Sequence, residues 1–259
     1  GVQSFHPEDL RFLNRRHDRE QAIKAVELCK EYGITNISID LIYGLPNQTQ
    51  QAWEENLRQA IRLDVPHLSA YHLIYEEGTA LYKLLEAGKV PPINEELSVS
   101  FFSTLIDRLA EAGYLHYEIS NFARPGFFSK HNSSYWTGKK YLGLGPSAHS
   151  YNGIDREWNP SSLPIYIDGI ENGHPTIESE DLDLCTLFND FIITGLRTMW
   201  GVSFADIQTK FGRKLLSYCQ KQAQPHINQG LLLQTGDKLI LSKSGIFVSD
   251  GIMSDLLWV

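Results

Sequence analysis

The spacing of apolar residues near the start of the chain predicts a helix over residues 19–33. Ile23, Val26 and Cys29 recur on one face of that helix. Asp18 precedes it and is a typical N-cap residue. We therefore expect this face, Cys29 included, to pack into a core.

The next segment alternates in the manner of a strand. In ITNISIDLIYGLP, apolar Ile39 and Leu41 alternate with polar Ser38 and Asp40 before Gly and Pro interrupt the pattern. A second helix is predicted after Thr49, and a second strand over residues 67–74. Strand, helix and strand in this order predict a parallel sheet with helical crossovers.

The rest of the chain has three further patterns. A short helix and a long amphipathic helix come first, followed by a stretch rich in Gly, Pro, Asn and aromatic residues. Three helices, a hairpin and a last helix follow that stretch. This order of three helices and a hairpin is typical of a winged-helix domain. The predicted helices are 79–87, 94–112, 181–198, 203–210, 213–228 and 245–256. The predicted domains are a barrel part over 1–118, a loop-rich region over 119–178 and a winged-helix-like domain over 179–259.

Composition narrows the class of protein. The 259 residues include 23 basic and 31 acidic side chains, a net charge of −8, with no block of Lys or Arg that could follow a phosphate backbone, so nucleic-acid binding is disfavoured. Because no apolar run approaches membrane-spanning length and no targeting segment is visible, we expect a cytoplasmic protein. The three widely spaced cysteines argue against a disulfide framework and for a reducing compartment.

Polar residues fall near the ends of the predicted strands, where parallel sheets place their chemistry. Asp40 alone could simply cap the following turn. Its surroundings favour a functional interpretation, because GVQSF, the pair Arg15 and Arg16, IDLIYGLP, SAYHLI, GYLHYEISNFARPG, HNSSYW and YLGLGPSAHSY follow in this order. This series resembles the radical S-adenosylmethionine (radical SAM) enzymes of the oxygen-independent coproporphyrinogen oxidase group.

The resemblance implies a fold and a cofactor site. The implied fold class is α/β: the C-terminal part of a partial (β/α)6 barrel, followed by the small α+β winged-helix domain. The resemblance further implies that Gln3, Arg15 and Asp40 bind S-adenosylmethionine and that Ile42 and Ile74 pack against its adenine. These side chains suit the roles, since carboxylate and amide oxygens accept hydroxyl protons and a guanidinium pairs with a carboxylate.

The chain departs from the family pattern at the 4Fe-4S cluster. The family holds this cluster with a CxxxCxxC loop, and no such loop occurs here. Cys29, Cys185 and Cys219 fall on three predicted helices and cannot replace it. The abrupt start at Gly1 therefore leads us to expect that a preceding half-barrel is missing and that this chain alone is inactive as an enzyme.

Within the family, HNSSYW fits the HNxxYW pattern of the HemW subgroup of heme chaperones, which implies binding of heme and transfer to client hemoproteins. His131 is the first candidate heme ligand and His149 the second, with Tyr135 and Trp136 able to flank a porphyrin. A histidine in a loop can equally make only a hydrogen bond. Glu118 and Asn121 in YEISNFARPG could position a substrate or hold their own loop.

Two other functions remain open. One is a true coproporphyrinogen III dehydrogenase that decarboxylates propionates in heme biosynthesis. The other is a DNA-binding regulator built on the winged helix, which is disfavoured because the helix over 213–228 carries few cations. The chain is thus expected to bind heme or another porphyrin and no nucleic acid.

Overall fold

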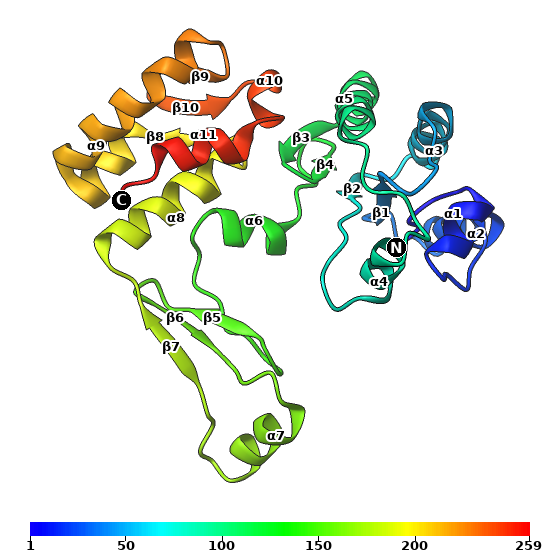
Figure 1. Cartoon of the computed structure of the whole chain (residues 1–259), viewed down its shortest axis with the longest axis horizontal. Coiled ribbons are helices and arrows are strands. Elements are labelled where there is room, and N and C mark those ends of the chain that lie inside the picture. Colours follow the sequence, from blue (N-terminus) through cyan, green and yellow to red (C-terminus); the bar gives the residue numbers. More distant parts are fainter. The chain divides into compact units, whose positions relative to one another are not determined.

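The computed structural model describes all 259 residues, and contacts divide them into two compact units, Gly1–Ser129 and Lys130–Val259 (Figure 1). The sequence-based boundaries at residues 118 and 178 remain predictions, whereas the contacts separate the chain after Ser129. No helix in either unit is both long enough and apolar enough to cross a membrane.

The first unit is built on a four-stranded sheet with the order β1-β2-β4-β3. Its elements are α1 (Pro7–Phe12), α2 (Arg19–Glu31), β1 (Ser38–Tyr43), α3 (Gln50–Arg62), β2 (His67–His72), α4 (Ala80–Glu86), α5 (Glu95–Glu111), β3 (Leu115–Glu118) and β4 (Asn121–Ala123). The parallel pairing predicted for the first two strands is confirmed. β4 pairs with β2 and β3 in antiparallel fashion, which the sequence did not predict.

Local signals explain where the helices of this unit begin. The Asp18 side chain accepts the backbone N–H of Gln21 at 2.8 Å, and the Gln21 side chain accepts the backbone N–H of Asp18, which completes a capping box at α2. At α3 and α5 only the first of these bonds is present: the Thr49 side chain accepts the backbone N–H of Ala52, and the Asn94 side chain accepts that of Leu97.

One face of the sheet carries the core of the first unit. Ile39 and Leu41 of β1 pack against the helices through Trp53, Leu57 and other buried side chains. The Trp53 indole donates a hydrogen bond of 2.9 Å to a carbonyl of α5, which ties α3 to α5. Cys29, expected in the core, is only half-buried.

The second unit combines two three-stranded antiparallel sheets with helices (Figure 1). Its elements are α6 (Lys130–Trp136), β5 (His149–Tyr151), β6 (Asp155–Trp158), α7 (Leu163–Glu171), β7 (Glu178–Asp181), α8 (Leu184–Leu196), β8 (Val202–Ser203), α9 (Phe204–Asn228), β9 (Leu232–Thr235), β10 (Lys238–Leu241), α10 (Lys243–Ile246) and α11 (Ser249–Leu256). The predicted hairpin is confirmed as β9–β10.

α9 corresponds to two predicted helices. Gly212 has φ 84° and ψ 173° inside it, so the helical path breaks there as the sequence pattern indicated. The core around α8, α9 and α11 includes Phe188, Ile192, Leu215 and Leu256. In contrast, α6, α7, β5 and β6 form within the predicted loop-rich region and β7 begins at its end, and the sequence predicted none of these elements.

Candidate functional site

The segment before α1 pairs with β1 through Gln3. The Gln3 N–H donates to the Asp40 carbonyl at 2.7 Å, and the Ile42 N–H donates to the Gln3 carbonyl at 2.8 Å. Gln3 has φ +68°, a left-handed conformation that costs a residue with a Cβ about 1–2 kcal/mol. The surrounding contacts must therefore hold Gln3 in this conformation.

Gln3 and Asp40 converge beside the backbone of Gly1. A Cβ at Gly1 would overlap the side-chain nitrogen of Gln3 and come within 2.9 Å of an Asp40 carboxylate oxygen. Gln3 is buried and Asp40 is half-buried. The structure thus brings together an amide and a carboxylate, one able to donate and both able to accept hydrogen bonds.

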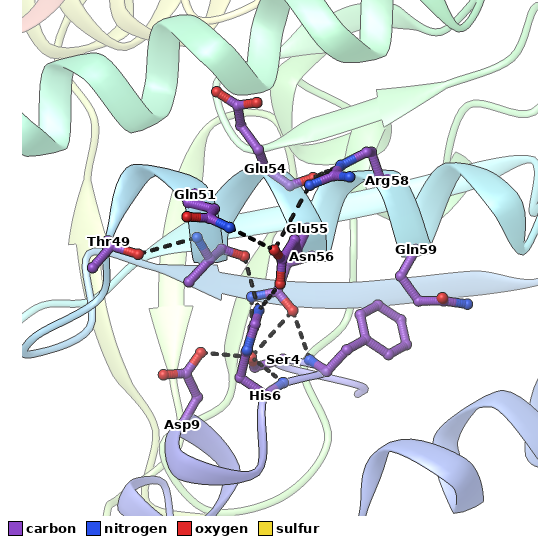
Figure 2. Close-up of polar contacts among 12 residues, drawn as sticks. Ser4, His6, Asp9, Thr49, Gln51, Glu54, Glu55, Asn56, Arg58 and Gln59 are labelled. Carbon is purple, nitrogen blue, oxygen red and sulfur yellow. Dashed lines mark hydrogen bonds and ion pairs between the residues drawn. The ribbon is translucent and has the colours of Figure 1, made fainter.

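A buried polar cluster anchors the residue next to Gln3 (Figure 2). Asn56 points from α3 toward this segment, accepts the Phe5 N–H at 2.7 Å and donates to Ser4 Oγ at 3.0 Å. Ser4 Oγ in turn donates to the Asp9 carboxylate at 2.6 Å. Ser4 and Asn56 are both fully buried, so these bonds fix the chain directly after Gln3.

A row of polar residues crosses the sheet from Asp40. Strand register pairs Asp40 with Ser69, Ser69 with Asn121, and Asn121 with Glu118, one residue from each strand. Residues paired in this way share one face, opposite to the face that Ile39 occupies. Ser69 Oγ donates to the Asn121 carbonyl oxygen at 2.7 Å, and the Asn121 amide donates to the Glu118 carboxylate. At about 4.8 Å per strand, the row spans about 14 Å.

His67 lies on the same face as this row. Its Nδ1 lies 2.7 Å from Ser38 Oγ and its Nε2 lies 2.8 Å from the Tyr117 hydroxyl. Burial lowers the pKa of His67, and the negative charge of Asp40 opposes that shift only in part. The imidazole is therefore neutral near pH 7 and acts as a link between two hydroxyl groups.

The other residues implied as cofactor ligands are more exposed than Gln3. The Arg15 side chain is exposed and makes no hydrogen bond or ion pair. Ile42 is half-buried, on the face of Asp40, and Ile74 is 73% exposed just beyond β2. The structure therefore joins Gln3 to Asp40 and leaves two apolar side chains at the C-terminal ends of the parallel strands.

In the second unit, α6 carries the HNSSYW segment. His131 and Tyr135 are exposed on one side of this helix, with rings 5.1 Å apart and the Tyr135 hydroxyl 3.3 Å from His131 Nε2. Tyr141 continues the series, 4.8 Å from the Tyr135 ring. The second candidate, His149, is exposed on β5, and its ring centre lies 5.7 Å from that of Trp158.

The cysteines do not fit a 4Fe-4S cluster. Cys29 belongs to the first unit, whereas Cys185 and Cys219 belong to the second. Burial raises the pKa of the Cys219 thiol to about 12, which disfavours the thiolate form that iron requires. No group of three or more His, Cys, Asp or Glu side chains in the chain is arranged to hold a metal ion.

Sequence reasoning missed Ser4, Asn56, Ser69 and His67 as parts of this region. Asn56 had one signal, a polar residue beside Trp53 and Leu57 on the apolar face of a helix. The others carry no signal in the sequence alone, because their partners lie about 30 to 50 residues away.

Comparisons with known proteins match both parts of the chain. The profile of the radical SAM superfamily matches residues 1–60, and that of the HemN C-terminal domain matches residues 182–248. The solved structure of coproporphyrinogen III oxidase (HemN) from Escherichia coli superposes with a TM-score of 0.81 over 99% of this chain and 62% of its own, at 21% identity. The fold and these profiles define a radical SAM protein with a HemN-like fold.

Relatives that align with nearly the whole chain show which family within this class it belongs to. The heme chaperones HemW of Bacillus subtilis and Lactococcus lactis are each 31% identical over 99% of this chain and 68% of their own length. The mouse radical S-adenosyl methionine domain-containing protein 1, mitochondrial, is 31% identical over 99% of this chain and 61% of its own. The chain belongs to the HemW family, as the HNSSYW pattern indicated, and spans about two thirds of the length of these relatives.

Proposed function

We propose that this chain is the part of a heme chaperone that binds heme on its second unit and S-adenosylmethionine on its first. The observation that carries the heme proposal is the exposed imidazole of His131 in edge-to-face contact with Tyr135, whose ring meets Tyr141 in the same manner, in a chain of the HemW family. An imidazole nitrogen is a common axial ligand of heme iron, and aromatic rings offer a porphyrin an apolar face. Client hemoproteins are the partners that this function requires.

The S-adenosylmethionine proposal rests on Gln3 and Asp40. The Asp40 carboxylate can accept the two hydroxyl groups of a ribose, and the adjacent Gln3 amide can donate to or accept from the same ligand. Ile42 and Ile74 offer apolar surface for the adenine at the neighbouring strand ends. The exposed guanidinium of Arg15 can pair with the ligand's carboxylate.

The family also implies a 4Fe-4S cluster, which would supply electron-transfer chemistry to the sulfonium cofactor if it were bound. The cysteines of this chain do not fit that role, so we assign no step of chemistry to them. All three are free thiols, which agrees with the reducing cytoplasm that we propose as the location.

Titration with hemin tests the heme proposal. We expect one Soret band to appear with the wild-type chain and to shift or vanish in His131→Ala, because an axial ligand sets the spectrum of bound heme. His174→Ala is the matched control, since His174 is another exposed histidine of the second unit. Both variants should keep the wild-type free energy of unfolding within about 0.5 kcal/mol.

The same titration distinguishes the two candidate ligands. An unchanged spectrum in His131→Ala together with an altered one in His149→Ala would transfer the role of ligand to His149. No hemin binding by the wild-type chain at micromolar concentration would refute the heme proposal for this chain.

A further inference from the structure

The contact between α6 and α8 gathers polar groups that the proposed site does not use. Ser133 and Trp136 are three residues apart and therefore share one side of α6. Arg197 is the C-cap residue of α8, and its guanidinium carbon lies 5.5 Å from the centre of the Trp136 ring. A cation at this distance over an indole face is attracted to it.

Three buried atoms of these residues have no hydrogen-bond partner: Ser133 Oγ, Trp136 Nε1 and Arg197 Nε. Only two other buried side-chain nitrogen or oxygen atoms in the chain share this condition, on Gln48 and His226. An unpaired buried donor costs about 1–3 kcal/mol, so three of them on one side of α6 and on the residue that Trp136 contacts indicate a missing partner. All three residues can donate a hydrogen bond, and two of the groups can only donate.

The charge at this contact is positive. Asp250, the acidic partner of Arg197, lies 4.0 Å from a terminal guanidinium nitrogen, and its side chain is 92% exposed, so it neutralises little of the charge. The Arg197 side chain is itself 32% exposed, which makes the guanidinium reachable from solvent. Hydrogen-bond donors beside the solvent-accessible Arg197 guanidinium suit a carboxylate as ligand. A carboxylate only accepts hydrogen bonds, and its two oxygens can pair with two N–H groups of a guanidinium.

We propose that Ser133, Trp136 and Arg197 form a binding site for a carboxylate of the ligand, which under the proposed function is a heme propionate. Trp136 lies five residues after His131, about 140° around the helix, so the two side chains cannot hold the same edge of a ligand. A porphyrin carries its propionates at its periphery, away from the iron. The iron at the centre of such a ligand and a carboxylate at its edge would therefore contact different parts of α6, the first at His131 and the second at Trp136.

Hemin and its dimethyl ester test this site in the full chain. Wild type is expected to bind hemin about tenfold or more tightly than the ester, because a charge-assisted hydrogen bond is lost with each esterified carboxylate. Arg197→Gln should lose about the same factor for hemin and little for the ester. Lys214→Gln is the matched control, since Lys214 lies 4.7 Å over the Trp258 ring without such unpaired donors.

A second measurement separates this proposal from heme binding itself. The ¹⁵N-resolved indole N–H resonance of Trp136, assigned with Trp136→Phe, should shift on addition of sodium propionate and not of propionamide, and the shift should disappear in Arg197→Gln. Trp136→Phe also removes one donor without removing the ring, so it serves as the binding variant if Arg197→Gln fails to fold.

The outcomes are distinct. A Trp136 response to propionate without any hemin binding would retain the carboxylate site and refute the heme proposal. Hemin binding with equal affinity for acid and ester, and no response of Trp136, would overturn the carboxylate site and leave the heme proposal intact.

Discussion

Replacing Asn56 by alanine should loosen the segment that carries Gln3. The Asn56 amide accepts the Phe5 N–H at 2.7 Å and donates to Ser4 Oγ at 3.0 Å, all at fully buried or nearly fully buried residues (Figure 2). The variant would leave the Phe5 N–H unpaired, which costs about 1–3 kcal/mol, and would lose a second buried bond worth about 1 kcal/mol. We expect a total loss of about 3 kcal/mol.

The loss should be local to the first unit. Hydrogen exchange followed by mass spectrometry on a peptide covering residues 1–13 should show an opening about 100-fold more frequent than in wild type, since 1.4 kcal/mol corresponds to a factor of ten. Gln51→Ala is the control, because Gln51 lies on the same helix but is exposed. It should change stability by less than about 0.5 kcal/mol.

The site should respond to the same change. Without its anchored neighbour, only the two backbone hydrogen bonds to β1 hold Gln3 at φ +68°, so we expect its amide to leave Asp40 more often. Binding of S-adenosylhomocysteine, measured by calorimetry, should weaken in Asn56→Ala and not in Gln51→Ala. A loss of stability below about 1 kcal/mol, or one equal to that of Gln51→Ala, would refute the anchoring role.

Three further predictions follow from burial. Gly1→Ala should weaken S-adenosylhomocysteine binding in the same assay, because its Cβ would displace the Gln3 side chain, and an unchanged affinity would argue against the convergence of Gln3 and Asp40. Native alkylation with iodoacetamide at about pH 8 should label Cys29 and Cys185 and spare Cys219, whose pKa burial raises to about 12. Burial lowers the pKa of three histidines of the first unit below 6.5, so the unfolded chain binds more protons than the folded chain as the pH falls. The urea midpoint of this unit should therefore fall as pH drops from about 7.5 to 5.5, and a midpoint that does not change with pH would contradict this. These histidines are His67, His72 and His116.

The helices of both terminal regions could be predicted because their signals are local. Asp18 and Thr49 cap helices through residues three positions away, and Gly212 interrupts a helix by its own backbone conformation. α6 and α7 escaped prediction for a physical reason. α6 has no buried residue, and α7 buries only Gly169, so neither has the apolar stripe that marks a packed helix.

The candidate site could be predicted only in part. Alternation along β1 indicated correctly that Asp40 faces away from Ile39 and Leu41. The row through Ser69, Asn121 and Glu118 depends on strand pairing between segments far apart in sequence. β4 has only three residues, too few for a recognisable period, so no pattern in the sequence indicated that it enters the sheet between β2 and β3.

The core determines which polar residues of β4 reach the site. Phe122 is 1% exposed on the helix-covered face and stacks on His116, with ring centres 4.3 Å apart. Because side chains alternate, a slip of β4 by one residue would turn Phe122 onto the polar face and bury Asn121 among apolar side chains. Asn121 would then lose its hydrogen bonds to Ser69 and Glu118, and Phe122 would lose its apolar contacts at the same time. Core packing and the polar row therefore select the same register, and each stabilises the other.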